Sequence, residues 1–180
     1  MEQIFAPWRI EWVERDDDDG DDEGCPFCEL PERGDDRDVN VVARSERTFV
    51  LLNNYPYNPG HAMVIPHRHA GEYGALSDAE LLDHARLKTR TFEALREALG
   101  PDAFNAGLNL GGPAGGSLSD HLHTHVVPRW NGDTNFMPVV ADTAVIVEAL
   151  DDTYERLHEA FASQANTTLS ETGAVRVDFD

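Results

Sequence analysis

Three histidines occupy alternate positions in the segment HLHTHVVPRW (residues 121–130). Side chains two positions apart share one face of a β-strand, so His121, His123 and His125 would form a row with about 6.5–7 Å between neighbours. In a helix they would be splayed by about 200° per step. The β-branched residues at 124, 126 and 127 favour the strand, and Pro128 would end its ladder or confine it to an edge. Such a row suits either nucleophilic catalysis or Zn²⁺ coordination.

The loop before this row, GGPAGGSLSD (residues 111–120), is rich in glycine. Glycine lets a backbone approach a ligand closely, and exposed N–H groups with a nearby hydroxyl suit phosphate oxygens. Imidazoles beside a phosphate cradle favour a histidine that attacks a phosphoryl or nucleotidyl group and forms a covalent intermediate. The candidates in and before the loop are Asn109, Gly115, Gly116 and Ser117.

The composition is that of a globular protein with an extreme charge. The chain has 180 residues, 41% of them hydrophobic, which predicts one domain with appendages. The net charge of −20 argues against nucleic-acid binding, because that needs a basic surface. Two interpretations remain, an acidic protein that is disordered or binds calcium, and a protein adapted to high salt, where self-repulsion is screened. The even spread of acidic residues between apolar segments favours the second.

Sequence features also bear on the compartment. The chain has no apolar run of about 18 residues and no basic-then-apolar start, so we expect neither a membrane span nor a secretory signal, and we expect a cytoplasmic protein. Cys25 and Cys28 are too close in sequence for an ordinary structural disulfide. In a reducing compartment they would be metal ligands or a redox pair.

The elements that must position these residues indicate an α+β fold. A capping box at Ser77 and Glu80 starts a long helix, which ends before Gly100. A second, C-terminal helix is expected over 144–163, and the last residues, AVRVDFD, alternate as a strand does. We predict a sheet of about five antiparallel strands, over 39–45, 48–54, 61–66, 103–110 and 121–129.

The segments GLNLGGPAGGSLSDHLHTHVVPRW and NNYPYNPGHAMVIPHRH resemble the histidine triad (HIT) superfamily, whose signature is His-φ-His-φ-His-φ-φ with φ apolar. Thr124 departs from that signature. APWR, NYPYNPGH and HVVPRW are most similar to the branch of diadenosine tetraphosphate phosphorylases or hydrolases, which shares a loop one residue longer than that of the commonest members. The resemblance covers about residues 39–140. It implies a HIT domain there, between an N-terminal extension (1–38) and a C-terminal helix and tail (141–180).

The resemblance implies a role for each matching position. His123 would attack the α-phosphate and carry the nucleotidyl group, while His121 and His125 would orient it. Asn53 would bind the ribose, with Asn54 as the alternative, although both suit a turn equally well. Phosphate or the leaving-group oxygen would be contacted by Asn109, Ser117 and the backbone of Gly115 and Gly116, and the base by apolar residues such as Phe49 and Leu51.

Zinc-bearing members of the superfamily have a Cys-x-x-Cys pair and two histidines. The matching residues here are Cys25, Cys28, His69 and His121, so the resemblance implies a structural Zn²⁺ site. His61 fits the Gly-His position and is interpreted as structural. The family also implies a homodimer, for which the helix 78–99 offers apolar residues over more than one face.

The sequence therefore predicts an enzyme that cleaves dinucleoside polyphosphates through a nucleotidyl-histidine. The acceptor in the second step, water or phosphate, is left open. The alternatives are a nucleoside phosphoramidase of the same superfamily, a nucleotide-binding regulatory protein with vestigial activity, and a metal-dependent hydrolase that uses the three histidines as ligands.

Overall fold

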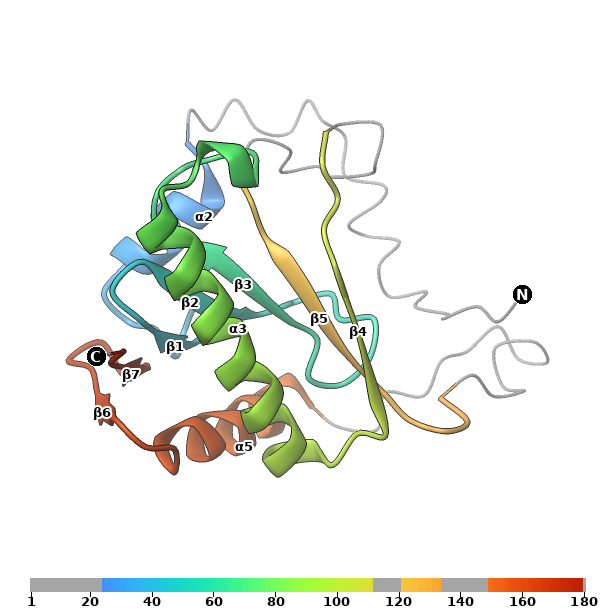
Figure 1. Cartoon of the computed structure of the whole chain (residues 1–180). Coiled ribbons are helices and arrows are strands. Elements are labelled where there is room, and N and C mark those ends of the chain that lie inside the picture. The colour runs from blue at the N-terminus through green and yellow to red at the C-terminus, as the bar shows by residue number, and fades with distance from the viewer. Residues whose placement is uncertain (1–23, 112–120, 134–148, 180) are drawn as a thin grey trace.

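One mixed sheet organises the molecule. The computed structural model describes residues 24–111, 121–133 and 149–179 (Figure 1). The strand order is β4-β5-β3-β2-β1-β7-β6. The strands are β1 (Val41–Arg44), β2 (Thr48–Leu52), β3 (Ala62–Pro66), β4 (Ala103–Gly107), β5 (Thr124–Arg129), β6 (Thr167–Leu169) and β7 (Val175–Val177). The helices are α2 (Pro26–Glu29), α3 (Asp78–Leu99) and α5 (Leu150–Ala162), with 3₁₀ turns η2 (Leu30–Glu32) and η3 (Tyr73–Ala75).

The α+β class is confirmed, but the predicted number of five strands is wrong. The C-terminal chain adds β6 and β7, an antiparallel pair. β7 pairs in parallel with β1, where Ala43 faces Val175, so the sheet is not purely antiparallel. The short β6 has a largely exposed Thr-Thr-Leu sequence, which carries no alternation that a sequence pattern could detect.

The long helix α3 begins and ends where its sequence predicts. Ser77 Oγ accepts a hydrogen bond from the Glu80 N–H, and the Glu80 carboxylate accepts one from the Ser77 N–H at 2.7 Å. Gly100 ends the helix in the left-handed conformation, with φ of 60°. That conformation favours glycine, because a Cβ would strain it. Between these two ends α3 packs on β2 and β3 of the sheet.

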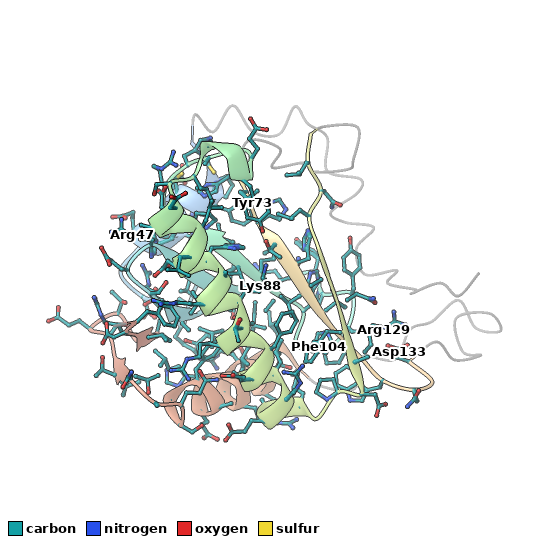
Figure 2. All side chains as sticks on the ribbon, in the orientation of Figure 1. Arg47, Tyr73, Lys88, Phe104, Arg129 and Asp133 are labelled. Atoms are coloured by element: carbon teal, nitrogen blue, oxygen red, sulfur yellow. The ribbon has the colours of Figure 1, made fainter. Side chains whose placement is uncertain are left out.

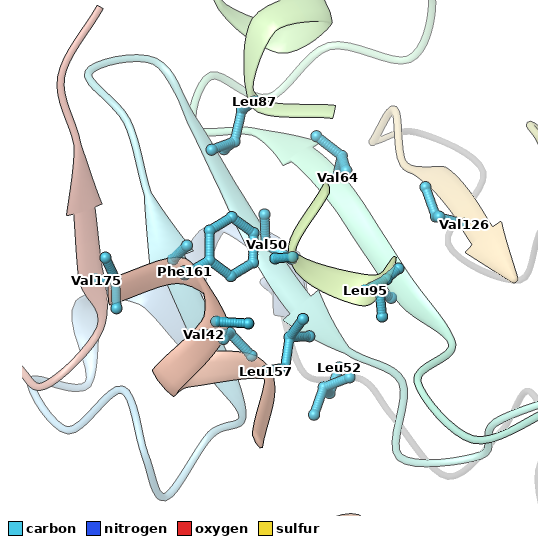
Figure 3. Close-up of a cluster of buried hydrophobic side chains, with 14 of the residues drawn as sticks. Val42, Val50, Leu52, Val64, Leu87, Leu95, Val126, Leu157, Phe161 and Val175 are labelled. Carbon is cyan, nitrogen blue, oxygen red and sulfur yellow. The ribbon is translucent and has the colours of Figure 1, made fainter. Parts of the chain in front are cut away.

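α3 and α5 cover one face of the sheet (Figure 1). Their buried residues Leu87, Leu157 and Phe161 pack on Val50 and Val64 of the central strands (Figure 3). Burial of each such side chain contributes roughly 1.5–3 kcal/mol. α5 therefore supplies part of the same core as the central strands. Among the described residues, no helix combines the length and the apolar character that a bilayer crossing requires.

The opposite face of the sheet carries the histidines. Cross-strand partners share a face, and Leu51 pairs with Met63, which pairs with His125. Leu51 and Met63 belong to a second buried cluster with Phe27 of α2 and Phe49. His125 therefore faces away from α3, towards the side that α2 covers.

The histidine segment is only partly a strand. β5 begins at Thr124, so the predicted strand over 121–129 is correct from Thr124 onwards and wrong for His121 and His123. The Leu122 N–H instead bonds the Ala70 carbonyl at 2.6 Å, in the loop that follows β3. β3 pairs with β5 only as far as Val126, so Pro128 lies where one neighbouring strand has already ended.

Candidate active site and metal centre

The three histidines of the segment lie together on the α2 side of the sheet. His121 and His123 are buried, with 1% and 8% of their surface exposed, and His125 is half-buried. The rings of His123 and His125 meet edge to face, with centroids 4.9 Å apart. The structure thus brings together the three residues that the sequence proposes as catalytic.

One hydrogen bond fixes the proton of His123. Its Nδ1 lies 2.8 Å from the backbone carbonyl of His121. A carbonyl oxygen only accepts, so Nδ1 carries the hydrogen and, in the neutral ring, Nε2 carries the lone pair. Burial lowers the pKa of His123 below its ordinary value, so the ring is neutral at neutral pH. A neutral imidazole with its lone pair on Nε2 is the form that can act as a nucleophile.

His61 orients the third histidine. The Tyr57 N–H donates to His61 Nδ1 at 3.1 Å, so the proton of neutral His61 lies on Nε2. That nitrogen is 3.0 Å from His125 Nδ1 and donates to it. The proton of neutral His125 therefore lies on Nε2, where it can be donated to a phosphoryl oxygen or a leaving group. From the sequence, His61 was interpreted as structural, and its place after Gly60 was the only sequence feature that marked it.

Thr124, which departs from the family signature, bonds to the helix behind the triad. Its Oγ1 lies 3.2 Å from His84 Nε2 and 3.1 Å from the Tyr73 hydroxyl. Burial, with the charge of Lys88 as a smaller cause, lowers the pKa of His84 to about 4, so His84 is neutral. A polar residue at position 124 is thus satisfied by α3 and η3 in an otherwise apolar layer.

Cys25, Cys28, His69 and His121 form a cluster of metal-ligating groups. Their ligand atoms all lie within 4.8 Å of one another. Cys25 Sγ is 3.3 Å and Cys28 Sγ 3.5 Å from His121 Nδ1, and Cys28 Sγ is 3.4 Å from His69 Nδ1. A tetrahedral zinc ion with Zn–S bonds of about 2.3 Å and Zn–N bonds of about 2.0 Å separates its ligand atoms by about 3.3–3.8 Å. The three sulfur–nitrogen distances fit that geometry, and the set as a whole is compact enough to close around one ion.

The protonation of the cluster also fits a cation. His121 Nε2 donates to the Pro66 carbonyl at 2.8 Å, which leaves the Nδ1 lone pair for a metal. Partial burial, and then the hydrogen bond and charge of Cys25, raise the pKa of the Cys28 thiol to about 11. A bound divalent cation would reverse that effect, because a coordinating thiol is deprotonated.

The structure describes the surroundings of some substrate-binding candidates and not of others. Asn53 Oδ1 accepts a hydrogen bond from the Tyr55 N–H at 2.8 Å and so forms a turn, while its amide nitrogen lies 3.6 Å from Met63 Sδ. Asn54 Oδ1 accepts a hydrogen bond from Asn40. Asn109 is half-buried after β4. Three further candidates, Gly115, Gly116 and Ser117, lie outside the described residues.

Arg129 lies at the far end of β5 and pairs with Asp133 (Figure 2). Its Nε and Nη2 donate to the two carboxylate oxygens at 2.6 and 2.9 Å, and its Nη1 donates to Asn105 Oδ1. The Arg129 guanidinium holds the pKa of Asp133 below its usual range. The positive charge of Arg129 is therefore already countered by a carboxylate.

These observations agree with comparisons to known proteins. A family model described as HIT domain matches residues 35–132. The chain belongs to the HIT domain family. It is 38% identical over 169 residues to an AP-4-A phosphorylase of Mycobacterium tuberculosis, a match that covers 91% of this chain and 86% of the relative. HIT membership makes it a nucleotide-processing enzyme, as the sequence predicted.

Two further relatives bear on the details. The adenosine 5'-monophosphoramidase hnt1 of Schizosaccharomyces pombe is 32% identical over 107 residues, which is 59% of this chain and 75% of the relative. A zinc-bound histidine triad family protein from Mycobacterium smegmatis has a similar structure, with a TM-score of 0.63 and 26% identity. That match covers 78% of this HIT chain and 94% of the other.

Proposed function

We propose that this HIT enzyme cleaves dinucleoside polyphosphates of the diadenosine tetraphosphate type through a covalent nucleotidyl-histidine on His123. The observation that carries the proposal is the hydrogen bond from His123 Nδ1 to the His121 carbonyl, because it leaves the Nε2 lone pair as the nucleophile. The AP-4-A phosphorylase relative supports the substrate class.

The proposed reaction has two displacements at one phosphorus. His123 Nε2 attacks the α-phosphorus, a P–N bond forms, and the bond to the bridging oxygen of the polyphosphate breaks. The Nε2 proton of His125, which His61 fixes in place, can neutralise the developing negative charge or be given to the leaving group. Water or inorganic phosphate then attacks the same phosphorus, and His123 leaves as the neutral imidazole.

The ribose and phosphate contacts are part of the proposal. Asn53, Asn109, Gly115, Gly116 and Ser117 would bind the nucleotide and the transferred phosphate. Asn53 is close to the end of β2 on the sheet, beside the triad face, which supports its assignment. Asn53 Oδ1 is used by the turn and one amide hydrogen by Met63 Sδ, so the second amide hydrogen is the one that could be donated to a ribose oxygen.

We expect diadenosine tetraphosphate to be a better substrate than an adenosine phosphoramidate. The assay measures the specificity constants of these two substrates and of diadenosine triphosphate, at high salt, with and without inorganic phosphate. With phosphate as acceptor the tetraphosphate gives ADP and ATP, and with water it gives AMP and ATP. A specificity constant that is higher for the phosphoramidate would reject this substrate class and leave the His123 mechanism intact.

A nucleoside phosphoramidase is the second candidate function, because one relative is named as an adenosine 5'-monophosphoramidase. A regulatory protein with vestigial activity would bind nucleotide without turnover in the same assay. The geometry argues against a hydrolase that uses the whole triad to bind its metal. His121 lies in the cysteine cluster, and His125 Nδ1 accepts from His61, which leaves an N–H and not a lone pair on His125 Nε2. The three histidines therefore do not offer three lone pairs to one ion.

We also propose that the cluster of Cys25, Cys28, His69 and His121 binds a structural Zn²⁺. Four nitrogen and sulfur donors make a closed site, in which the ion stabilises the fold and does not touch the substrate. The zinc-bound relative supports this choice of metal. Reduced cysteines suit the cytoplasm, the compartment that we propose.

We propose a homodimer whose copies meet at β4. Among the described residues β4 is the end strand of the sheet and is largely exposed, and such an edge can pair with a strand of another chain. Beside it, Phe92, Arg96 and Phe104 line a hollow of about 360 Å³, and Leu82 of α3 is 52% exposed. Light scattering at high salt should give about twice the chain mass of 20.0 kDa. A monomer at micromolar concentration would exclude the dimer.

We propose adaptation to high salt on the basis of the net charge of −20. Salt shortens the Debye length to about 3 Å at 1 M and so screens repulsion among the carboxylates. The melting temperature and the rate of turnover should both rise from dilute buffer to about 2 M KCl. A melting temperature that is flat or falls over this range would contradict the proposal. We further propose a HIT domain over about 39–140, between an N-terminal extension and a C-terminal helix and tail; the family model, which matches residues 35–132, supports its position in the chain.

A further inference from the structure

Phe27, which lies between the two cysteines of the metal cluster, packs on the proposed nucleophile. Its ring centroid is 5.1 Å from that of His123 and 5.8 Å from that of His121. The Phe27 side chain is 4% exposed. The segment that supplies two candidate metal ligands therefore also supplies one wall of the nucleophile's surroundings.

His123 is held from three directions. Phe27 packs against its ring at an interplanar angle of 52°, and His125 meets it edge to face at 83°. The third constraint is the hydrogen bond from Nδ1 to the His121 carbonyl at 2.8 Å. Loss of Phe27 would open one side of the ring, so that the imidazole could rotate and water could compete for the Nδ1 proton.

The short helix that carries Phe27 is held by the cysteines as well as by the apolar cluster that Phe27 joins. α2 has only four residues, and a helix of that length is not stable without tertiary contacts. Cys25 and Cys28, on either side of Phe27, contact His121 Nδ1 at 3.3 and 3.5 Å. The chain after α2 has a separate anchor, because Arg44 donates to the Pro31 carbonyl at 2.8 Å. A loss of metal would thus loosen α2 locally.

We propose that Phe27 is a positioning residue for His123, and that an occupied metal site holds its ring against the nucleophile. The proposal deepens the proposed function, since it rests on His123 as nucleophile and on a metal at the cysteine cluster. Occupancy of the metal would then control the orientation and the tautomer of His123 through two routes, the Phe27 ring and the His121 carbonyl.

The test uses the full metal-loaded chain with ¹⁵N-labelled histidine, and records the ring nitrogens at one neutral pH and high salt. The His123 signals are assigned by their loss in His123→Asn. In the wild type, Nδ1 of His123 should be protonated and slow to exchange, and Nε2 unprotonated. Phe27→Leu should give a mixture of tautomers with faster exchange, and kcat should fall roughly tenfold while KM changes little.

Two controls separate positioning from stability. Phe161→Leu removes part of an equally buried ring on the other face of the sheet, so it should lower the melting temperature without changing the His123 signals. Removal of metal from the wild type with a chelator should reproduce the tautomer mixture, which gives a result even where Phe27→Leu fails to fold.

Wild-type signals after chelation would overturn the link to the metal. If Phe27→Leu has the His123 signals and the kcat of the wild type, Phe27 does not position His123. If the variant changes only KM, by raising it, the positioning role is also rejected, and Phe27 is instead a nucleotide contact. The nitrogen signals do not depend on turnover. A chain that shows the expected signals but cleaves no nucleotide would reject the proposed function and keep the positioning of His123.

Discussion

Replacement of His123 by alanine is expected to abolish turnover of diadenosine tetraphosphate while nucleotide binding persists. His123 supplies the attacking Nε2, and no other histidine of the triad has the same hydrogen bonding, because His121 Nδ1 faces the cysteines and His125 Nδ1 faces His61. Loss of a covalent nucleophile lowers kcat by on the order of 10³-fold or more. The measurement is kcat in a steady-state assay, with nucleotide affinity measured by calorimetry.

His158 offers a matched control for this experiment. It lies on α5, where its Nε2 bonds the Gly173 carbonyl, so His158→Ala should leave turnover close to that of the wild type. Added imidazole should partly restore the activity of His123→Gly, because the small molecule can take the place of the missing ring. An alanine variant that keeps more than about a tenth of the wild-type rate would exclude covalent catalysis at His123.

The double replacement Cys25→Ser/Cys28→Ser is expected to remove one zinc ion per chain and to lower the melting temperature. A metal that binds only the folded state, present at about 1,000 times its Kd, stabilises that state by about 4 kcal/mol. For a chain of this length, the loss lowers the melting temperature by roughly 10 °C. Elemental analysis of protein purified without chelators and a thermal melt measure the two effects.

Treatment with a chelator is the matched experiment for the cysteine variant. It should lower the melting temperature of the wild type to that of the variant and leave the variant unchanged, because both changes remove the same ion. Metal-free wild type that melts at the same temperature as freshly purified protein would exclude a stabilising metal at the cluster.

The sequence was most informative where a local pattern determines the structure. The capping box at Ser77 and the glycine at position 100 set the bounds of α3. The alternation of histidines was enough to indicate a shared face, although His121 and His123 precede the strand itself. Cys25, Cys28, His69 and His121, which the resemblance implied as a set, meet in space.

The rest depends on contacts between segments that are distant in the sequence. β6 is a strand only because β7 lies beside it, and β7 is held by β1. The bond between His61 and His125 and the packing of Phe27 on His123 depend on how loops cross the sheet. Neither His61 nor Phe27 carries a spacing pattern of its own, so their contacts to the triad could not be derived from the sequence.

The stereochemistry at the attacked phosphorus tests the central proposal most directly. Diadenosine tetraphosphate made chiral at the α-phosphorus with oxygen isotopes would be turned over completely, and the configuration of the nucleotide product determined. Each in-line displacement inverts the phosphorus, so attack by His123 followed by attack of the acceptor predicts net retention. Net inversion would mean that water or phosphate attacks the substrate directly, and it would contradict a nucleotidyl-His123 intermediate.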